Sequence, residues 1–469
     1  MDISNTVFRR RFALNMYKDM EISLGQMSFS KDFVKDKRGD PYPLSEISDG
    51  ASEAVANGVY RVKNGHALRY ICSTFPYASY EADGDISTGR LGFVLKTEKF
   101  TARIIFDKDG VCFSCGDTEE KTQISAVGRV TYSVTCRPGA IDVYSKREGH
   151  TEFVHTFLCP ELEAISEHRV FSKGGAYLYA ENASVFAARS YIDNGISQAD
   201  MRPIRYENGE VMTENGRIFF TASVRLQAGG YQAIFYWLPG TAEFEMTGVL
   251  LYDAGDGKWC GDVAASVLYH REKGCYMLWM CSFSHGHVLG HSVFYGDIRY
   301  GVNVADITLM EQGSKSDITA FLGFKGDEDP DFFYDCQRGK WLMAICRIDP
   351  DTHAYRYVFF ESDEPFEGYG YIGKGLDGAE TGGSFVRIDG ELCFACGNDF
   401  KAVSDYRIYR KSGMINPKFD LPDGGFRGWG SIIPLRIGSR TKYYWLTFDR
   451  HNGSGYNWSY GNVYVFEAE

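Results

Sequence analysis

The chain has 469 residues, a hydrophobic content of 44% and a net charge of -12. This length exceeds that of one typical domain, so we expect two. The acidic balance, with no basic tract to offset it, argues against nucleic acid and anionic membranes as partners. No apolar run approaches the ~20 residues of a membrane-spanning helix.

Residues 1–50 are expected to form a polar lead-in, within which Val7–Met20 is compatible with a short basic helix. They show no apolar stretch followed by a small-residue cleavage site, so we expect no signal peptide. The twelve cysteines are scattered, several of them inside apolar strands. We therefore expect reduced, buried thiols in a cytoplasmic protein, with no metal and no cofactor.

From Gly58 to Ile192, short segments of alternating hydrophobicity follow one another with turn signals between them. The expected strands are Val59–Val62, Leu91–Lys96, Thr101–Phe106, Val130–Cys136, Ala140–Tyr144, Ala176–Ala180 and Ser184–Ile192. No helix-length periodicity separates them, so residues 51–195 are predicted to be an antiparallel β-sandwich. The run from Val130 to Tyr144 resembles paired strands of concanavalin-like (laminin-G-type) sandwiches.

Asp193–Pro203 is polar and irregular, and we place the domain boundary there. Over residues 200–469 one unit recurs: a polar or acidic residue, an apolar strand, a turn and an aromatic-rich strand. Its turn residues, spaced 51 to 65 apart, are Gly216, Gly274, Gly339, Gly390 and Thr441. Four strands with their loops need about that length, so the repeat predicts an all-β, five-bladed propeller.

The residue ahead of each innermost strand of a propeller is expected at one rim of the central tunnel. In the first four units these residues are Glu210, Asp262, Asp329 and Glu380, and the fifth has Trp429. Four carboxylates around a funnel suit glycoside hydrolysis. One carboxylic acid protonates the leaving oxygen, and a carboxylate acts on water or on the sugar. A further carboxylate can raise the pKa of the acid by like-charge repulsion.

The third unit carries the clearest motif. Asp329-Pro330-Asp331-Phe332-Phe333, then Gly339-Lys340-Trp341-Leu342, resembles the Asp-Pro-Ser-Phe-Phe and Gly-Lys-Tyr-Leu strands of five-bladed propeller glycosidases. The resemblance covers about residues 204–469. It is to the family 43 arabinanases and xylosidases, and more distantly to the family 32 fructosidases, which have Arg where Glu328 stands.

Two other units extend the resemblance. Trp259 to Val263 is similar to the family's second-blade Trp-Ala-Pro-Asp unit. Gly428 to Ser431, followed by Arg450, is similar to the fifth-blade Gly-His-Gly-Ser unit and its Arg, which implies that Arg450 faces the sugar. Trp429 replaces the His often associated with a central ion, so we do not expect calcium.

The resemblance also implies catalytic roles. Glu380 would be the general acid, and Asp329 would orient it and tune its pKa. The family's first blade opens with Ala-Asp-Pro, whose Asp is the base of an inverting reaction. The match taken here is Gly209-Glu210-Val211, so Glu210 would activate water, or Asp262 if Glu210 faces away.

Several of these residues have a second interpretation. Trp259 and Trp429 could stack on a sugar or pack inside the propeller. The histidines at 285, 287 and 291 could suggest a metal, but no Cys or carboxylate stands at ligand spacing. We therefore expect a rim loop with His285 near the substrate. A slip of two residues would make Asp331 the rim acid of the third blade.

The sequence thus predicts a glycoside hydrolase that removes a terminal sugar from a plant- or host-derived oligosaccharide. Two alternatives stay open. A propeller glycoside phosphorylase would bind phosphate through cations such as Arg427, Arg450 and His285. A non-catalytic carbohydrate-binding protein would need no acid pair. The sandwich domain could bind sugar, wall the site or join copies of the chain into a homo-oligomer.

Overall fold

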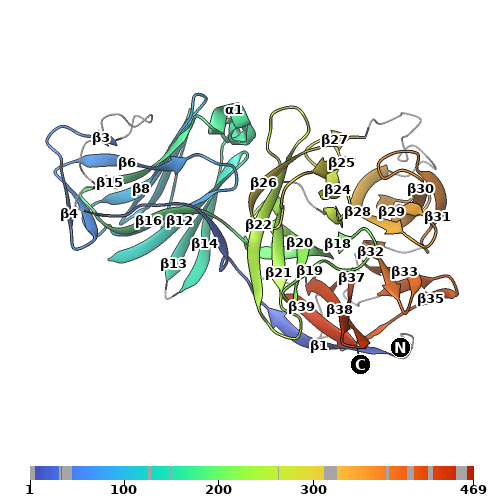
Figure 1. The fold of residues 1–469 in the computed structure, drawn as a ribbon. Coiled ribbons are helices and arrows are strands. Elements are labelled where there is room, and N and C mark those ends of the chain that lie inside the picture. The colour runs from blue at the N-terminus through green and yellow to red at the C-terminus, as the bar shows by residue number, and fades with distance from the viewer. Residues whose placement is uncertain are drawn as a thin grey trace. The chain divides into compact units, whose positions relative to one another are not determined.

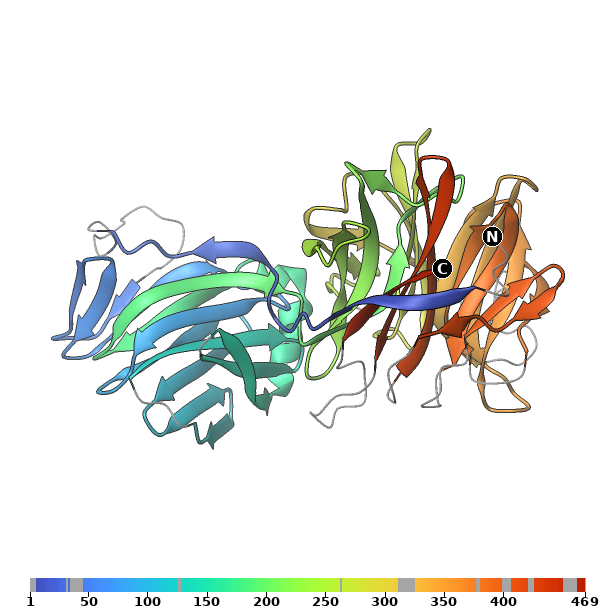
Figure 2. The same ribbon diagram turned by 90° about the horizontal axis from the view of Figure 1, so that it is seen from below.

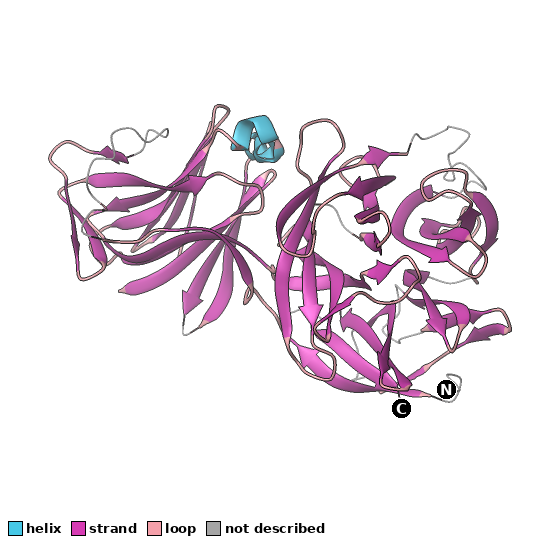
Figure 3. Ribbon diagram, viewed as in Figure 1, coloured by secondary structure: helices cyan, strands magenta, loops and turns pink. Residues whose placement is uncertain are grey.

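The computed structural model describes residues 6–30, 33, 45–124, 128–147, 149–261, 264–310, 325–376, 380–398, 406–420, 426–449 and 462–468. The chain divides into two compact units. One contains Met1–Met20, Asn194–Asp256 and Cys260–Glu469, and the other contains Glu21–Asp193 with Gly257–Trp259. Strands dominate both units (Figure 3). Among the described residues, no helix has the length and apolar character to cross a membrane.

The unit of Glu21–Asp193 contains two antiparallel sheets. The first has the order β11 (Thr118–Thr122), β10 (Gly110–Cys115), β9 (Thr101–Asp107), β8 (Arg90–Lys96), β15 (Gly175–Glu181), β6 (His66–Ser73), β3 (Ser45–Ile47). The second has the order β14 (His150–Leu158), β13 (Ala140–Arg147), β12 (Arg129–Arg137), β7 (Ser79–Asp85), β16 (Ser184–Asp193), β5 (Val59–Lys63), β4 (Ser52–Ala56), and β2 (Glu21–Gln26) also pairs with β16. Each of the seven expected strands is present.

One hydrophobic core joins these two sheets. The Phe106 ring of β9 stacks on Tyr132 of β12 with centroids 4.2 Å apart, and Phe113 of β10 stacks on Phe157 of β14 at 5.0 Å. Side chains alternate between the faces of a strand, so each sheet turns one face to this core. A 3₁₀ helix, η1 (Pro160–Ser166), and the short α1 (His168–Phe171) lie between β14 and β15.

The other unit is a five-bladed propeller (Figures 1 and 2). Blade 1 consists of β17 (Ser197–Pro203), β20 (Arg217–Arg225), β21 (Gly230–Trp237), β22 (Phe244–Asp253) and β26 (Gly301–Asp306), with β19 (Thr213–Glu214) beside β20. Blade 2 consists of β18 (Arg205–Tyr206), β23 (Ser266–His270), β24 (Cys275–Ser282), β25 (Val288–Phe294) and β27 (Thr308–Leu309). In Figure 1 the blades surround a centre near which β18, β28, β32 and β37 lie.

Three blades follow in chain order. Blade 3 consists of β28 (Lys325–Asp335), β29 (Lys340–Ile348), β30 (Tyr355–Ser362) and β31 (Gly370–Lys374). Blade 4 consists of β32 (Glu380–Ile388), β33 (Glu391–Asn398), β34 (Arg407–Arg410) and β35 (Gly413–Ile415). Blade 5 consists of β37 (Phe426–Ile437), β38 (Arg440–Asp449), β39 (Val463–Ala468), β1 (Val7–Leu14) and β36 (Lys418–Phe419). The five-bladed fold predicted from the repeat is confirmed.

The N-terminal segment is not a lead-in. Val7–Leu14 forms strand β1 of blade 5, which pairs antiparallel with β39, and not the short basic helix with which the sequence of Val7–Met20 is compatible. Pairing supplies the backbone hydrogen bonds of this segment and buries Phe8 completely. The Phe8 ring packs on Phe419 at 4.9 Å and on Trp445 at 5.3 Å between centroids. A separate helix would leave that ring in water.

Blade 1 also begins earlier than predicted. Its inner strand is β17, which lies inside the stretch taken for the domain boundary, and not the segment around Glu210. All seven residues of β17 are buried although four of them are polar or charged. Arg202 binds carbonyls of blades 3 and 4 and Asp200 pairs with Arg225 of β20, so polar residues that are typical of an exposed linker are buried in this strand.

The cysteines are free thiols throughout. Nine of the twelve are buried, Cys72 and Cys112 are partly buried, and Cys336 is exposed.

Candidate functional site

The inner strands of the propeller break their pairing at a common level. The register shifts lie between Ala199 and Arg202 in β17, between Glu328 and Asp331 in β28, between Thr381 and Ser384 in β32, and between Arg427 and Ser431 in β37. Left-handed backbone angles occur at this level in four blades: φ is +58° at Asp200, +63° at Ala264, +48° at Asp329 and +59° at Gly382. Residues other than glycine rarely adopt this conformation, and where they do a function is a reasonable hypothesis.

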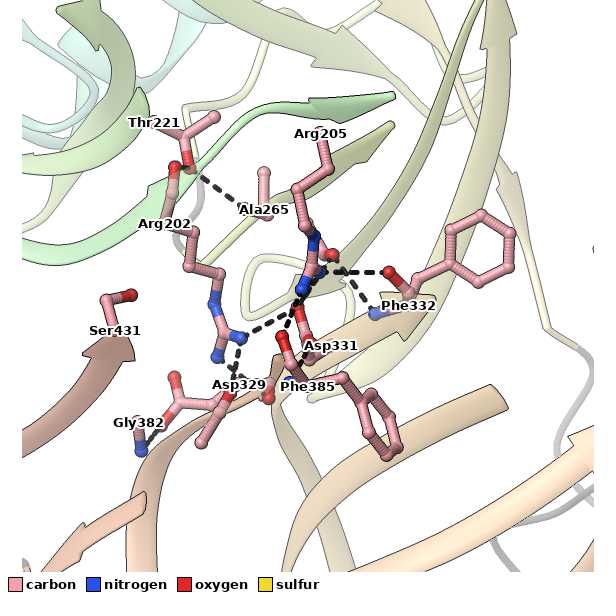
Figure 4. Close-up of polar contacts among 12 residues, drawn as sticks. Arg202, Arg205, Thr221, Ala265, Asp329, Asp331, Phe332, Gly382, Phe385 and Ser431 are labelled. Carbon is pink, nitrogen blue, oxygen red and sulfur yellow. Dashed lines mark hydrogen bonds and ion pairs between the residues drawn. The ribbon is translucent and has the colours of Figure 1, made fainter. Parts of the chain in front are cut away.

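Asp329 occupies the break of β28 and is 7% exposed. Its Oδ2 accepts hydrogen bonds from the Thr381 hydroxyl at 2.9 Å and from the Gly382 N–H at 3.4 Å. The Arg202 guanidinium donates to the Asp329 backbone carbonyl at 3.1 Å (Figure 4). Blades 1 and 4 therefore both hold this aspartate of blade 3.

Asp200 occupies the equivalent break in β17 and is 2% exposed. The Arg225 guanidinium donates to its Oδ2 at 3.1 Å. Its Oδ1 is buried and accepts no hydrogen bond from any described residue. Leaving a buried acceptor unsatisfied is costly, and such a group calls for a donor from water or a ligand.

The sequence-based prediction missed Asp200. The signal that could have found it is Ala199-Asp200-Met201, which is closer to the first-blade Ala-Asp-Pro motif than Gly209-Glu210-Val211 is. The stretch was assigned to the domain boundary because its polar residues suggested a linker. Asp200 and Asp329 thus form a pair of equivalent aspartates in blades 1 and 3.

Below this pair, charged side chains fill the propeller axis. The Asp331 carboxylate accepts from Arg205 at 2.6 Å and from the Phe385 N–H at 2.6 Å, and lies 3.3 Å from Arg202. The Ser266 hydroxyl of blade 2 also donates to it at 3.1 Å. Asp331 is 0% exposed, so it is a buried anchor between blades and not a rim acid (Figure 4).

Glu380 begins β32 at the same end as Asp329, since its neighbour Thr381 donates to that aspartate. The Glu380 carboxylate itself accepts from the Tyr357 N–H at 3.0 Å, from Arg407 at 3.2 Å and from the Tyr409 hydroxyl. Burial raises the pKa of this carboxyl, against the three hydrogen bonds that favour its ionised form. The observed partners of the carboxylate thus belong to blades 3 and 4 and do not include Asp329.

Glu210 lies at the other end of the propeller. Its neighbour Gly209 lies against the ring of Phe333, four residues beyond Asp329 along β28. Glu210 is exposed and its side chain accepts from Asn208 at 2.8 Å. The structure does not bring it together with Asp329. Asp262 and Arg450, and the side chain of Arg427, lie outside the residues whose placement is described.

Trp429 is packed inside the propeller, whereas Trp259 is partly buried and belongs to the other unit. Trp429 is 1% exposed, donates its indole N–H to the Met201 carbonyl at 3.0 Å and lies against Gly382. Trp259 belongs to the unit of two sheets, where it stacks on His168 at 4.8 Å and meets Phe171 edge-on. The Trp429 indole is therefore part of the packing of the propeller.

His285 does lie at the rim end. It follows β24, whose Cys281 donates to the Asp327 carbonyl just ahead of Asp329. Its Nδ1 is 2.7 Å from the Ser282 hydroxyl, and its Nε2 is 3.6 Å from Asp256. Within the described ranges, no three His, Cys, Asp or Glu side chains are grouped closely enough to hold a metal ion.

No protein-family model matches this sequence, and no curated protein matches it. Among solved structures it is similar to a thermostable family-43 glycoside hydrolase, at 12% identity over 58% of this chain and 89% of the other, with a TM-score of 0.38. It is also similar to a family-43 β-1,3-galactosidase, at 11% identity over 56% and 93% with a TM-score of 0.39. A third is Bacillus subtilis levansucrase, at 9% over 58% and 86% with a TM-score of 0.40. Likeness at this level does not define an activity.

Proposed function

We propose that the propeller unit is a glycoside hydrolase whose site is built around Asp200 and Asp329. The observation that carries the proposal is their equivalent placement: each occupies the left-handed break of an inner strand, one in blade 1 and one in blade 3. Carboxylates at one level of a propeller can act together on a glycosidic bond. The Oδ1 of Asp200, which has no hydrogen-bond donor among the described residues, can accept a hydrogen bond from water or a sugar hydroxyl.

The roles follow from these environments. Asp200 is held by the Arg225 guanidinium at 3.1 Å through Oδ2 alone, an arrangement that leaves its other oxygen for a water molecule to be activated. Asp200 thereby replaces Glu210 in the role first assigned to the Gly209-Glu210-Val211 segment. Asp329, fixed by Thr381 and Gly382, would orient the acid and the sugar. We expect inversion at the anomeric carbon, as the resemblance to family 43 implies.

Glu380 remains the proposed proton donor. Its pKa is raised by burial, and a general acid needs a raised pKa to carry its proton at working pH. Its carboxylate would have to leave Tyr409 and Arg407 to reach a substrate. That movement is the part of the proposal that activity measurements test most directly.

The first experiment is a screen of the purified protein against aryl glycosides and plant oligosaccharides. On any substrate that is cleaved, Asp200→Asn and Asp329→Asn are each expected to lower kcat/KM by about 10²–10⁴-fold. Asp306→Asn makes the same substitution at an exposed aspartate of blade 1 and should leave activity unchanged. Equal activity in all four proteins would place the chemistry elsewhere, and the anomer released, read by proton NMR, decides inversion or retention.

A second candidate is a carbohydrate-binding propeller without catalysis. The observation in its favour is the Glu380 carboxylate, whose three partners lie in blades 3 and 4. In that case Glu380→Gln would leave sugar binding intact, and no turnover would exist to abolish.

A phosphorylase would instead require inorganic phosphate in the assay. For the other unit we propose a concanavalin-like sandwich, supported by its two sheets and the core that joins them, in a cytoplasmic protein.

A further inference from the structure

The axis of the propeller is lined with oxygen atoms that two arginines bind. Arg202 donates to the carbonyls of Gly383 at 2.5 Å and Asp329 at 3.1 Å. Arg205 donates to the carbonyls of Phe385 at 2.6 Å and Phe332 at 3.0 Å. The Asp331 carboxylate lies between them, 3.3 Å from one guanidinium and 2.6 Å from the other (Figure 4).

The two arginines are alike in burial but differ in their contact with the candidate site. Their side chains are 2% and 5% exposed, and both pair with Asp331. Arg202 binds the backbone of Asp329 itself, at the break of β28. Arg205 binds further along β28 and β32, at the carbonyls of Phe332 and Phe385.

We propose that Arg202 is a positioning residue for Asp329. The inference rests on the proposed function in giving Asp329 a part in the reaction. Arg202 binds the carbonyl of a residue held at a φ of +48°, and through Gly383 it binds the strand whose Thr381 donates to the Asp329 carboxylate. It fixes both the backbone and a partner of this aspartate.

Its charge acts on Asp329 as well. A nearby guanidinium favours the carboxylate, and a nearby carboxylate disfavours it. Among the described groups, the Arg202 guanidinium of β17 and the Tyr357 hydroxyl of β30 donate to the Asp329 carbonyl at 3.1 Å and 3.4 Å, and Thr381 and Gly382 of β32 donate to its carboxylate. Asp331 of β28 lies 3.3 Å from the same guanidinium. Arg202 and Asp331 therefore act on Asp329 in opposite directions.

The test measures the titration of Asp329 without a substrate. The free energy of unfolding in urea is followed from pH 3 to 8 for the full chain and for its Asp329→Asn counterpart, and the difference traces the Asp329 carboxyl. The same pair is measured in Arg202→Met and in the matched control Arg205→Met. Both variants remove one buried guanidinium from the same aspartate.

We expect Arg202→Met to raise the midpoint pH of the Asp329 titration by about one unit. Arg205→Met should move this midpoint by less than half as much. Asp331→Asn should lower the midpoint. Equal shifts in the two arginine variants, or no shift in either, would overturn the proposal, because both arginines would then be structural alone.

Arg202→Lys is the variant to use where Arg202→Met does not fold, since it keeps the charge and can keep one of the two carbonyl bonds. Its midpoint is expected to stay within about 0.3 units of the parent protein. On a cleaved glycoside it should lower kcat by about tenfold, with a smaller change in KM. If no glycoside is cleaved, the proposed function fails, while the titration result still decides whether Arg202 acts on Asp329.

Discussion

At Glu380, burial and hydrogen bonding shift the pKa of the carboxyl in opposite directions. The Tyr409 hydroxyl, the Tyr357 N–H and the Arg407 guanidinium all favour its carboxylate form, yet burial raises its pKa above the ordinary value of 4.5. The folded protein therefore holds this proton more tightly than the unfolded chain does. That contribution to stability is present in full below pH 4.5 and is lost as the pH rises through the folded pKa.

We expect Glu380→Gln to expose this dependence. The free energy of unfolding of the parent protein, relative to the variant, should fall as the pH rises above about 4.5. Glu391→Gln is the matched control, because the hydrogen bond from Arg410 lowers the Glu391 pKa. The free energy of unfolding of the parent protein relative to Glu391→Gln should instead rise with the pH. Urea unfolding between pH 3.5 and 8 measures both free-energy differences. A difference between the parent protein and Glu380→Gln that grows with pH would contradict the raised pKa of Glu380.

Single residues also mark the limit of sequence-based prediction. Asp329 could be predicted because Asp-Pro ahead of Phe-Phe is a recognisable motif. Asp200 was missed, because β17 buries its polar residues through tertiary contacts, whereas a polar stretch is typical of an exposed linker. The assignment of a rim position to Glu210 was wrong for the same reason: the blade was counted from the first apolar segment and not from the buried polar one.

At the scale of the strand, a glycine can be required for its backbone conformation or for the lack of room for a side chain, and Gly382 and Gly438 differ in this. Gly382 and Gly438 both have left-handed backbones, with φ of +59° and +63°. A Cβ at Gly382 would come within 2.2 Å of the Trp429 ring, whereas a Cβ at Gly438 would meet nothing within 4 Å. Only Gly382 therefore needs the absence of a side chain for packing at the break of β32.

The pair of substitutions to alanine tests this distinction. Gly438→Ala is expected to cost about 1 kcal/mol, the strain of a left-handed alanine. Gly382→Ala should cost about 1–3 kcal/mol more, because a buried indole must move. Chemical denaturation followed by tryptophan fluorescence measures both values. Equal losses would show that Trp429 adapts at no cost.

Strands that pair with their neighbours in sequence were predicted from local pattern alone. β8 and β9 form a hairpin around a turn, and the alternation of apolar residues in β9 marks its buried face. β1 has no such neighbour: its partners are β39 and β36, from the other end of the sequence. Its exposed basic residues 9–11 suggested a helix because nothing local indicates a distant strand.

At the scale of the whole molecule, each of the two units has hydrophobic core of its own, which should respond separately to mutation. Phe8 lies in a core of blades 4 and 5, and Phe93 lies in the core of the two-sheet unit; both are 0% exposed. A phenylalanine-to-alanine change at such a site costs about 3–5 kcal/mol. Multi-domain chains often unfold in more than one step.

We expect calorimetry to show two transitions, with Phe8→Ala lowering one and Phe93→Ala lowering the other. The tryptophan emission change, dominated by the propeller indoles, should follow the transition that Phe8→Ala lowers. A single transition lowered alike by both substitutions would mean that the two units unfold together.

The pairing of β1 with β39 has a consequence for synthesis on the ribosome. Phe8 is translated long before Ala468, which it faces in the finished blade. At about 5–20 residues per second, the nascent chain carries β1 for tens of seconds with no partner for its edge or for its phenylalanine. Chaperones that shield such an edge, and the delay before β39 emerges, therefore bear on the yield of folded protein.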